Sequence, residues 1–250
     1  MKLARKLQKL LTAEAFASFW EHAQRLTHSV DSSPLLVRLD RPAWKRLQEK
    51  YPRAQADINR FAEVDYWIGI NTERAQDLWL DRAGPLQILD LGCGPGYFLY
   101  VCRQLGHHGL GLDVGNVALF RETTALLEVP RVIWRIEPQQ KLPALERKFD
   151  LVTAHRICFH ETYPAGGNFP DGEWSAADWQ FFIDDIREHL LAPNGRLLLD
   201  FNPRPDGRTF FTPELRRLLH ENGARIFRSK ALLSIDRRVR PRFKSSRADL

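Results

Sequence analysis

The segment from Ile88 to Phe98, Ile-Leu-Asp-Leu-Gly-Cys-Gly-Pro-Gly-Tyr-Phe, constrains the fold more than any other part of this chain. It has the pattern of an apolar strand that ends in an acid and is followed by a glycine-rich turn opening a helix. Gly92, Gly94 and Gly96 allow positive φ angles and a close approach of the backbone to a ligand. Backbone N–H groups at the start of a helix attract carboxylates and phosphates. The segment therefore predicts a nucleotide-like cofactor at the carboxyl end of the first strand.

The spacing of the glycines excludes two common phosphate-binding turns. A dinucleotide turn requires G-x-G-x-x-G, whereas the residue three positions after Gly94 is Tyr97. The G-x-x-x-x-G-K-[ST] pattern is also absent. A tight turn without any ligand is the remaining alternative, and we disfavour it because three glycines this close are conformationally costly.

The sequence from Asp90 to Gly96, Asp-Leu-Gly-Cys-Gly-Pro-Gly, resembles the first motif of the class I S-adenosylmethionine-dependent methyltransferases. The resemblance covers roughly residues 60–236 and is closest to bacterial stand-alone enzymes, some of which modify saccharides or secondary metabolites. It implies an α/β, doubly wound, mostly parallel seven-stranded sheet with an antiparallel last strand, the Rossmann-like methyltransferase fold. It also implies S-adenosyl-L-methionine as cofactor and S-adenosyl-L-homocysteine as product.

Strands and helices alternate along most of the chain, which is typical of a parallel sheet covered on both faces. We expect strands at 86–91, 109–113, 131–136, 149–154 and 195–201, with two more within 225–235. Helices are expected at 42–50, 53–63, 65–81, 97–105, 117–127 and 176–191, and after Thr212-Pro213, with Ser175 and Thr212 as caps. The predicted organisation is an N-terminal helical extension (1–82), a cofactor-binding domain (83–236) and a basic, mobile tail (237–250).

The cofactor contacts are expected at strand ends, because open α/β sheets bind ligands outside the carboxyl ends of their strands. A carboxylate at Asp113 can accept both ribose hydroxyls, although it could instead cap the next helix. The resemblance assigns Asp90 to the cationic end of the methionine moiety and Ile136-Glu137 to the adenine ring, the latter on a weaker match. The remaining predicted contacts are Gly92, Cys93, Gly94, Gly96, Val114 and His155.

The residues after the fourth strand line up with the region that faces the methyl group in the resembled family. Methyl transfer is an in-line displacement in which positioning supplies much of the rate. A hydroxyl acceptor also benefits from a base, and histidine has the suitable pKa. His155 and His160, with Glu161 behind them, are the catalytic candidates, and packing or hydrogen-bonding histidines are the alternative. We expect no metal site, because the two histidines are five residues apart and the cysteines stand singly.

Two other segments are candidates for covering the site. The connection at 161–174 is long and rich in Gly, Pro and aromatic residues, which favours a lid over the acceptor, with a surface insertion as the alternative. Tyr66 and Trp67 precede the cofactor turn and are expected either to line the pocket or to pack in the core.

The net charge of +6 is concentrated at the two ends of the chain. Residues 1–10 carry +4 and residues 237–250 carry +5, so that residues 11–236 carry −3. The apolar spacing at 3–20 predicts an amphipathic helix, which either packs on the protein or makes peripheral contact with a membrane surface. The chain shows no membrane span, secretory signal or cysteine pairing, which favours the cytoplasm.

The sequence thus favours a methyltransferase whose acceptor is a small molecule or saccharide, methylated on oxygen or nitrogen. An RNA methyltransferase that holds the phosphate backbone with its basic termini is the alternative, disfavoured by the acidic body. The third hypothesis is a protein that binds the cofactor but does not catalyse methyl transfer. The acceptor, the methylated atom and the oligomeric state are not indicated.

Overall fold

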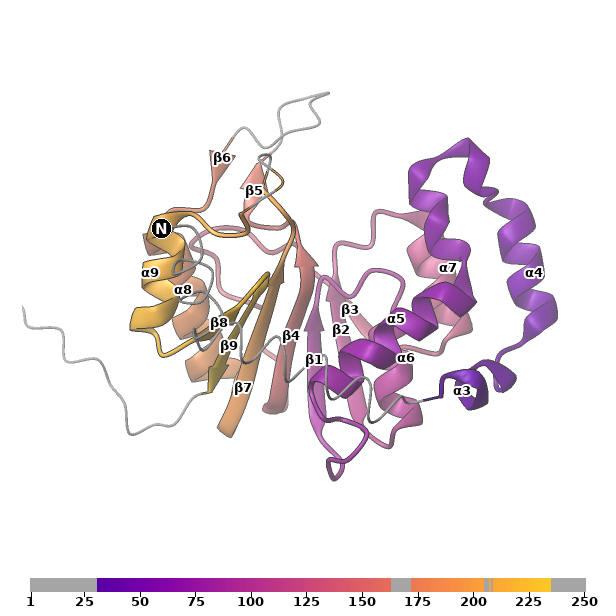
Figure 1. The fold of residues 1–250 in the computed structure, drawn as a ribbon, viewed down its shortest axis with the longest axis horizontal. Coiled ribbons are helices and arrows are strands. Elements are labelled where there is room, and N and C mark those ends of the chain that lie inside the picture. Colours follow the sequence, from indigo (N-terminus) through magenta and orange to yellow (C-terminus); the bar gives the residue numbers. More distant parts are fainter. Residues whose placement is uncertain (1–30, 163–171, 205–206, 208, 235–250) are drawn as a thin grey trace, which may run out of the picture.

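A seven-stranded sheet crosses the middle of the molecule, with helices on both of its faces (Figure 1). The structure, a computed structural model, describes residues 31–162, 172–204, 207 and 209–234. The strand order is β3-β2-β1-β4-β7-β9-β8, and β9 runs antiparallel to both of its neighbours while β3, β2, β1, β4 and β7 run parallel. The predicted α/β fold, with its antiparallel last strand, is therefore confirmed. The strands are β1 (Gln87–Leu91), β2 (His108–Asp113), β3 (Arg131–Ile133), β4 (Phe149–Ile157), β7 (Leu191–Phe201), β8 (Arg225–Phe227) and β9 (Lys230–Ser234).

The helices form one group before β1 and a second group between the strands. The first group contains α3 (Ser33–Val37), α4 (Arg41–Lys50), the short 3₁₀ turns η1 (Arg53–Gln55) and η2 (Asp57–Ala62), and α5 (Val64–Asp77). The second contains α6 (Tyr97–Gln104), α7 (Ala118–Leu126), α8 (Ala176–Asp185), the π-helical turn η3 (Ile186–Leu190) and α9 (Pro213–Glu221). Both predicted caps are present, since Ser175 Oγ accepts from the N–H of Asp178 and Thr212 Oγ accepts from that of Leu215.

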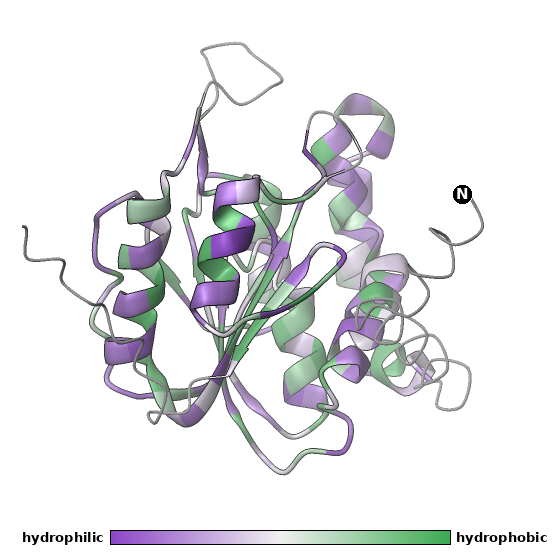
Figure 2. Ribbon diagram, turned by 60° about the vertical axis from the view of Figure 1, so that its left-hand side comes forward, coloured by the Kyte–Doolittle hydropathy of each residue, from purple (hydrophilic) through white to green (hydrophobic). Residues whose placement is uncertain are grey.

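Strand residues alternate between two apolar clusters, one on each face of the sheet. Leu89 and Leu199 face α8 and α9, whereas Ile88, Leu151 and Leu198 face α5 and α6. Figure 2 shows the matching pattern on the helices, whose hydrophobic sides turn inward. The helices before β1 share the second cluster with the sheet, and α5 packs directly against α6. The boundary at residue 82 between extension and domain stays a prediction. Among the described residues, no helix is long and apolar enough to cross a membrane.

Several element boundaries differ from the expectation, and three of the differences are larger than a residue or two or break an element. The segment 53–63 is not one helix, because Ala56 is extended (φ −157°) and separates η1 from η2. The third strand ends at Ile133 rather than Ile136, and the long helix from Ala176 leaves α-helical geometry at Ile186. The difference in the third strand lies at its end, where assignments vary most, whereas the other two lie within the expected helices.

Several predictions fall on residues outside the described part of the chain. The amphipathic helix at 3–20 and the basic tail lie there, as do residues 163–171 of the expected lid. The ends of that segment pair as a short antiparallel ribbon of β5 (Glu161–Thr162) and β6 (Gly172–Glu173). Trp174, expected in an aromatic wall over the acceptor, is instead buried in the core beside Trp179.

Gly111 on β2 provides a test of this packing. A Cβ at Gly111 would lie 2.4 Å from Cys93 Sγ and 3.0 Å from Cys93 Cβ, so that β2 can pass under the glycine turn only without a side chain. Gly111→Ala should lower the free energy of unfolding by about 1–3 kcal/mol in urea titration. Gly84→Ala is the control, because a Cβ there would meet nothing within 4 Å. Equal stability of the two variants would contradict this packing.

Candidate functional site

A cavity of about 660 Å³ lies at the carboxyl ends of β1, β4 and β7, on the face of the sheet that α5 covers. Its wall combines residues of η2 and α5, the turn after β1, the ends of β4 and β7, and the start of β9. The volume is in the range of pockets for small ligands. The position corresponds to the strand ends where the sequence predicts a cofactor.

The three glycines of the turn after β1 all have positive φ, at +69° for Gly92, +51° for Gly94 and +82° for Gly96. Their spatial requirements differ. A Cβ at Gly92 would meet no heavy atom within 4 Å, whereas one at Gly96 would lie 3.0 Å from Thr124 Cγ2. Gly92 and Gly94 line the cavity, and Gly96 packs the turn onto α7. The open space at Gly92 is what a ligand held against the backbone requires.

Hydrogen bonds fix this turn to the end of β2. The carbonyl of Leu112 accepts from the N–H groups of Gly92 (2.7 Å) and Cys93 (3.1 Å). Asp113 Oδ2 accepts from the N–H of Gly94 (3.0 Å), and Oδ1 accepts from the N–H of Gly115 (2.9 Å). The Asp113 carboxylate is therefore held in one orientation beside the turn. Each of its oxygens keeps a lone pair that can accept a hydroxyl.

Asp90 lies in the wall of the cavity and is only 3% exposed. Its Oδ1 accepts from the hydroxyl of Thr153 at 2.7 Å. Burial raises the pKa of Asp90 to about 7, although the Thr153 hydrogen bond and the Arg74 charge act in the opposite direction. A cationic group arriving next to this carboxylate would favour its ionised form.

His155 also lines the cavity, where its ring lies against that of Phe98 at 4.5 Å between centroids. Both of its ring nitrogens are closed to solvent and have no hydrogen-bond partner in the described part of the chain. Burial lowers the pKa of His155 well below its usual value, and the cations Arg74, Lys230 and Arg156 act in the same direction. The ring is therefore neutral near pH 7, with one nitrogen that can donate and one that can accept a hydrogen bond.

His160 and Glu161 lie elsewhere. His160 packs among aromatic rings, 5.3 Å from Trp179 and 5.5 Å from Phe201 between centroids, and it does not line the cavity. Burial lowers its pKa to about 4. Glu161 Oε1 lies 3.6 Å from His160 Nε2 in β5, also outside the cavity wall. Of the three catalytic candidates, the structure thus brings only His155 to the cavity, and catalytic roles for the other two stay predictions without support from its geometry.

Of the remaining predicted cofactor contacts, Val114 was expected near the end of the second strand, and Ile136 and Glu137 were assigned to the adenine ring. Val114 is 37% exposed at the end of β2, but Ile136 is 8% exposed and packs in the core, and Glu137 lies 4.0 Å from Arg135. Because β3 ends early, the exposed apolar side chain at its carboxyl end is Ile133, which contacts Gly115 and is 55% exposed.

A charged end of the cavity, formed by Asp77, Arg156, Asp200, Ser229 and Lys230, was not predicted. The strand register places His155, Asp200 and Lys230 side by side on β4, β7 and β9.

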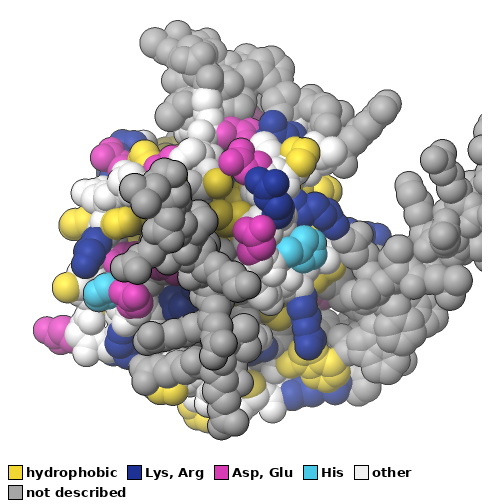
Figure 3. Space-filling model, turned by 90° about the vertical axis from the view of Figure 1, so that its left-hand side faces the viewer, with side chains coloured by type: hydrophobic (Ala, Val, Ile, Leu, Met, Phe, Trp, Pro, Cys, Tyr) yellow, Lys and Arg dark blue, Asp and Glu magenta, His cyan; other side chains and the backbone are white. Residues whose placement is uncertain are grey.

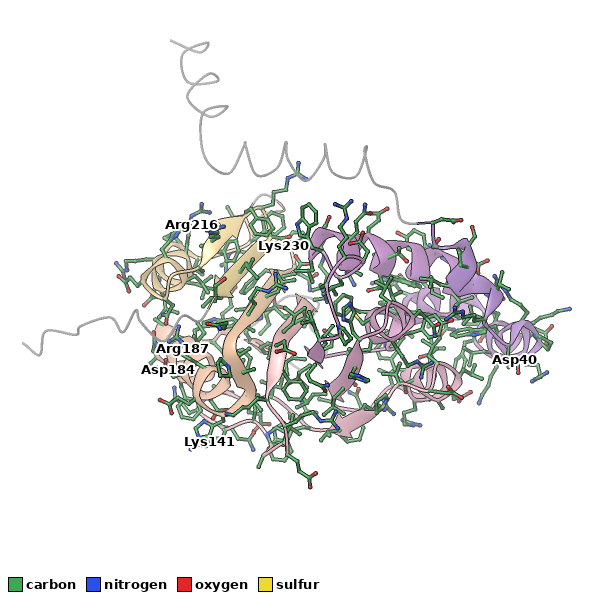
Figure 4. The ribbon with its side chains drawn as sticks, turned by 90° about the horizontal axis from the view of Figure 1, so that it is seen from below. Asp40, Lys141, Asp184, Arg187, Arg216 and Lys230 are labelled. Carbon is green, nitrogen blue, oxygen red and sulfur yellow. The ribbon has the colours of Figure 1, made fainter. Side chains whose placement is uncertain are left out.

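The charged groups of this end are paired with one another. Lys230 Nζ lies 2.7 Å from Asp77 Oδ2, an ion pair that joins β9 to α5, and Lys230 lies between these two elements in Figure 4. Ser229 Oγ donates to Asp200 Oδ1 at 2.6 Å, and Arg156 Nε lies 3.7 Å from Asp200 Oδ2. Asp200, like Asp90 and Asp113, lies near the carboxyl end of an apolar strand. This placement is visible in the sequence and could have predicted Asp200 as a residue of the site.

The opposite, aromatic end of the cavity lies beside the glycine turn. Phe61 and Trp67 stack at 4.5 Å between centroids, and Phe120 meets Phe61 edge-on at 5.2 Å. Trp67 therefore lines the pocket, while Tyr66 is 58% exposed. The two ends differ in chemistry, one suited to flat apolar groups and the other to hydrogen-bonding groups.

These residues fit the sulfonium nucleoside that the sequence predicts. The open space at Gly92 and the carboxylate of Asp113, which adjoins the glycine turn but is not itself part of the cavity wall, can hold a ribose. The buried carboxylate of Asp90, which is part of the wall, can face the cationic amino-acid end. Among the described residues, no group of three or more His, Cys, Asp or Glu is arranged to hold a metal ion.

Comparison with known proteins agrees with this arrangement. Residues 89–169, about a third of the chain, match a family model described as a methyltransferase domain. No curated protein matches the chain.

Three of the solved structures that are similar to this chain follow, all at low sequence identity. The ribosomal protein L11 methylase of Lactobacillus delbrueckii subsp. bulgaricus is 18% identical over 66% of this chain and 78% of its own, with a TM-score of 0.40. CalS10, an amino pentose methyltransferase from Micromonospora echinaspora solved with S-adenosylmethionine, is 21% identical over 58% and 54%, with a TM-score of 0.39. DesVI of Streptomyces venezuelae is 17% identical over 56% and 52%, with a TM-score of 0.38. The chain spans about half the length of the latter two.

Asp90 makes stability depend on pH in a distinctive direction. Its folded-state pKa of about 7 lies above the value of 3.8 expected when unfolded. The folded state therefore binds more protons between these values, and the free energy of unfolding falls as pH rises from about 4 to 7. In the wild type, this group should lower the free energy of unfolding by on the order of 4 kcal/mol across this window. In Asp90→Asn this pH-dependent fall should be absent, as measured by urea unfolding at several pH values. Parallel pH profiles for wild type and variant would contradict the burial of this carboxylate.

Proposed function

We propose that this chain, whose residues 89–169 match a methyltransferase-domain model, is an S-adenosylmethionine-dependent methyltransferase that methylates a small, polar acceptor, such as a saccharide, on oxygen or nitrogen. The observation that supports the proposal is the charged end of the cavity, which adjoins His155 and continues away from the glycine turn. Its side chains are all hydrogen-bonding groups, and the cavity volume of about 660 Å³ suits a cofactor with a small partner.

In the proposed mechanism, the cavity aligns the acceptor with the reacting methyl group. When bound, the cofactor supplies a methyl group on a cationic sulfur that departs as a neutral thioether. Asp113 would hold the ribose, Asp90 would face the cationic amino-acid end, and the ring of His155, which lines the cavity, would pack against the acceptor. Because burial lowers the pKa of His155, its role near neutral pH is to orient the acceptor rather than to store its proton. Alignment of the reacting atoms is then the main source of rate.

Nucleic acid is a less favoured acceptor. On the face seen in Figure 3, Lys and Arg side chains are interspersed with Asp and Glu rather than gathered into one basic surface. The basic termini, on which the RNA alternative depends, lie outside the described residues. We also propose a cytoplasmic location, with which the three free cysteines agree.

The direct test combines cofactor binding with an acceptor panel. Calorimetry should show S-adenosylhomocysteine binding to the wild type and binding about 10- to 100-fold weaker in Asp113→Asn, which loses charge-assisted hydrogen bonds to ribose. Asp184→Asn, whose carboxylate lies outside the cavity beside Arg187 (Figure 4), is the control. Methyl-labelled cofactor should then label saccharides or small amines. Label transferred to RNA alone, or no binding of the product nucleoside, would overturn the proposal.

The two histidines should respond differently to substitution. His155→Ala removes the group that orients the acceptor and should lower kcat by about 10- to 100-fold. His160→Phe replaces one ring by another within an aromatic cluster, so kcat should change by less than about threefold. Steady-state kinetics with the best acceptor of the panel measures both. A larger loss for His160→Phe than for His155→Ala would reverse the assignment.

A further inference from the structure

One face of α5 follows the cavity along its length. Trp67, Asn71, Arg74 and Asp77 recur at helical spacing and all line the cavity wall. Trp67 belongs to the aromatic end and Asp77 to the charged end. Arg74 is therefore midway along the cavity, between the glycine turn and the Lys230 end.

Arg74 differs from the other cations of the wall in lacking an acidic partner. Arg60 pairs with Asp57, Arg156 Nε lies 3.7 Å from Asp200, and Lys230 Nζ lies 2.7 Å from Asp77. For Arg74, no carboxylate oxygen of the described residues lies within 4.0 Å. Its one hydrogen bond in this part of the chain runs from Nη1 to Asn71 Oδ1, at 3.0 Å.

The nearby carboxylates are already engaged. Asp200 accepts from Ser229 Oγ at 2.6 Å, and Asp90 accepts from Thr153 Oγ1 at 2.7 Å. Both still act on Arg74 through space, and burial lowers its pKa. A guanidinium has five N–H donors, so several remain free to face a ligand. A partly desolvated cation with free donors is stabilised when an anion arrives.

We propose that Arg74 is the carboxylate-binding residue of the methyl-transfer cavity. A carboxylate fits because it is planar, matches the guanidinium fork with two hydrogen bonds and carries a single charge. A phosphate would bring a second negative charge toward Asp90 and Asp200. The carboxylate comes either from the amino-acid end of the methyl donor or from an acidic acceptor. The proposal rests on the proposed function for the identity of the cavity.

The test uses the full chain with matched variants. Arg74→Met removes the charge and Arg74→Lys keeps it without the fork. Arg82→Met is the control, since Arg82 lies outside the cavity wall and pairs with Asp81 at 3.5 Å. Thermal melting establishes that each variant is folded. In the first arm, calorimetry compares S-adenosylhomocysteine with its decarboxylated form, which retains the amine. In the second arm, candidate acceptors are offered as free acids and as the matching amides.

If the donor supplies the carboxylate, wild type and Arg82→Met prefer S-adenosylhomocysteine over its decarboxylated form by about 10- to 100-fold, and Arg74→Met abolishes that preference. If the acceptor supplies it, Arg74→Met leaves this preference intact and instead removes a preference for acids over amides in kcat/KM. In either case Arg74→Lys should restore part of the preference. Wild-type ratios in both arms for a folded Arg74→Met would overturn the proposal. Binding of S-adenosylhomocysteine to the wild type itself reports on the proposed function, so the two can fail separately.

Discussion

The attachment of the glycine turn to the end of β2 is the constraint on which the rest of the site depends. Two backbone N–H groups of the turn reach the carbonyl of Leu112, and a third reaches the carboxylate of Asp113. These bonds require the positive φ angles that the glycines adopt and the close approach that Gly111 permits. They place the turn, the Asp113 carboxylate and the start of α6 in fixed relation at one edge of the sheet.

Much of the fold follows from the sequence because its signals are strong and local. The apolar run before Gly92, the caps at Ser175 and Thr212 and the strand–helix alternation each predict an element that the structure contains. Boundaries were less predictable. The end of β3 at Ile133 and the extended residue Ala56 between η1 and η2 are not signalled by the apolar spacing used for the prediction.

The candidate site was predictable on its cofactor side and less so on its acceptor side. Asp90, Gly92, Gly94 and Asp113 belong to one continuous pattern around the first two strands. The charged end is assembled from α5, β4, β7 and the start of β9, which the sheet register, the shared apolar cluster and the Lys230–Asp77 pair bring together. His160, a histidine next to the expected site, packs among aromatic rings and outside the cavity wall, so its catalytic role stays a prediction.

The cavity also shows how buried charge can be tolerated near a reacting centre. Two pairs of opposite charge lie in the cavity wall, Lys230 with Asp77 and Arg156 with Asp200. In addition, the hydroxyls of Ser229 and Thr153 donate hydrogen bonds to the carboxylates of Asp200 and Asp90. Such pairing lets a low-dielectric pocket keep its polar groups ready for a ligand. Within the described residues, Arg74 is a cation of the cavity wall that forms no ion pair with a carboxylate. The two ring nitrogens of His155, also in the cavity wall, have no hydrogen-bond partner there.

The most direct test of the central claim is a crystal structure with S-adenosylhomocysteine bound. The account predicts the ribose hydroxyls within hydrogen-bond distance of Asp113, the nucleoside lying over Gly92 and Gly94, and the sulfur facing His155. A nucleoside bound elsewhere, or a sulfur directed away from His155 and the charged end, would contradict it.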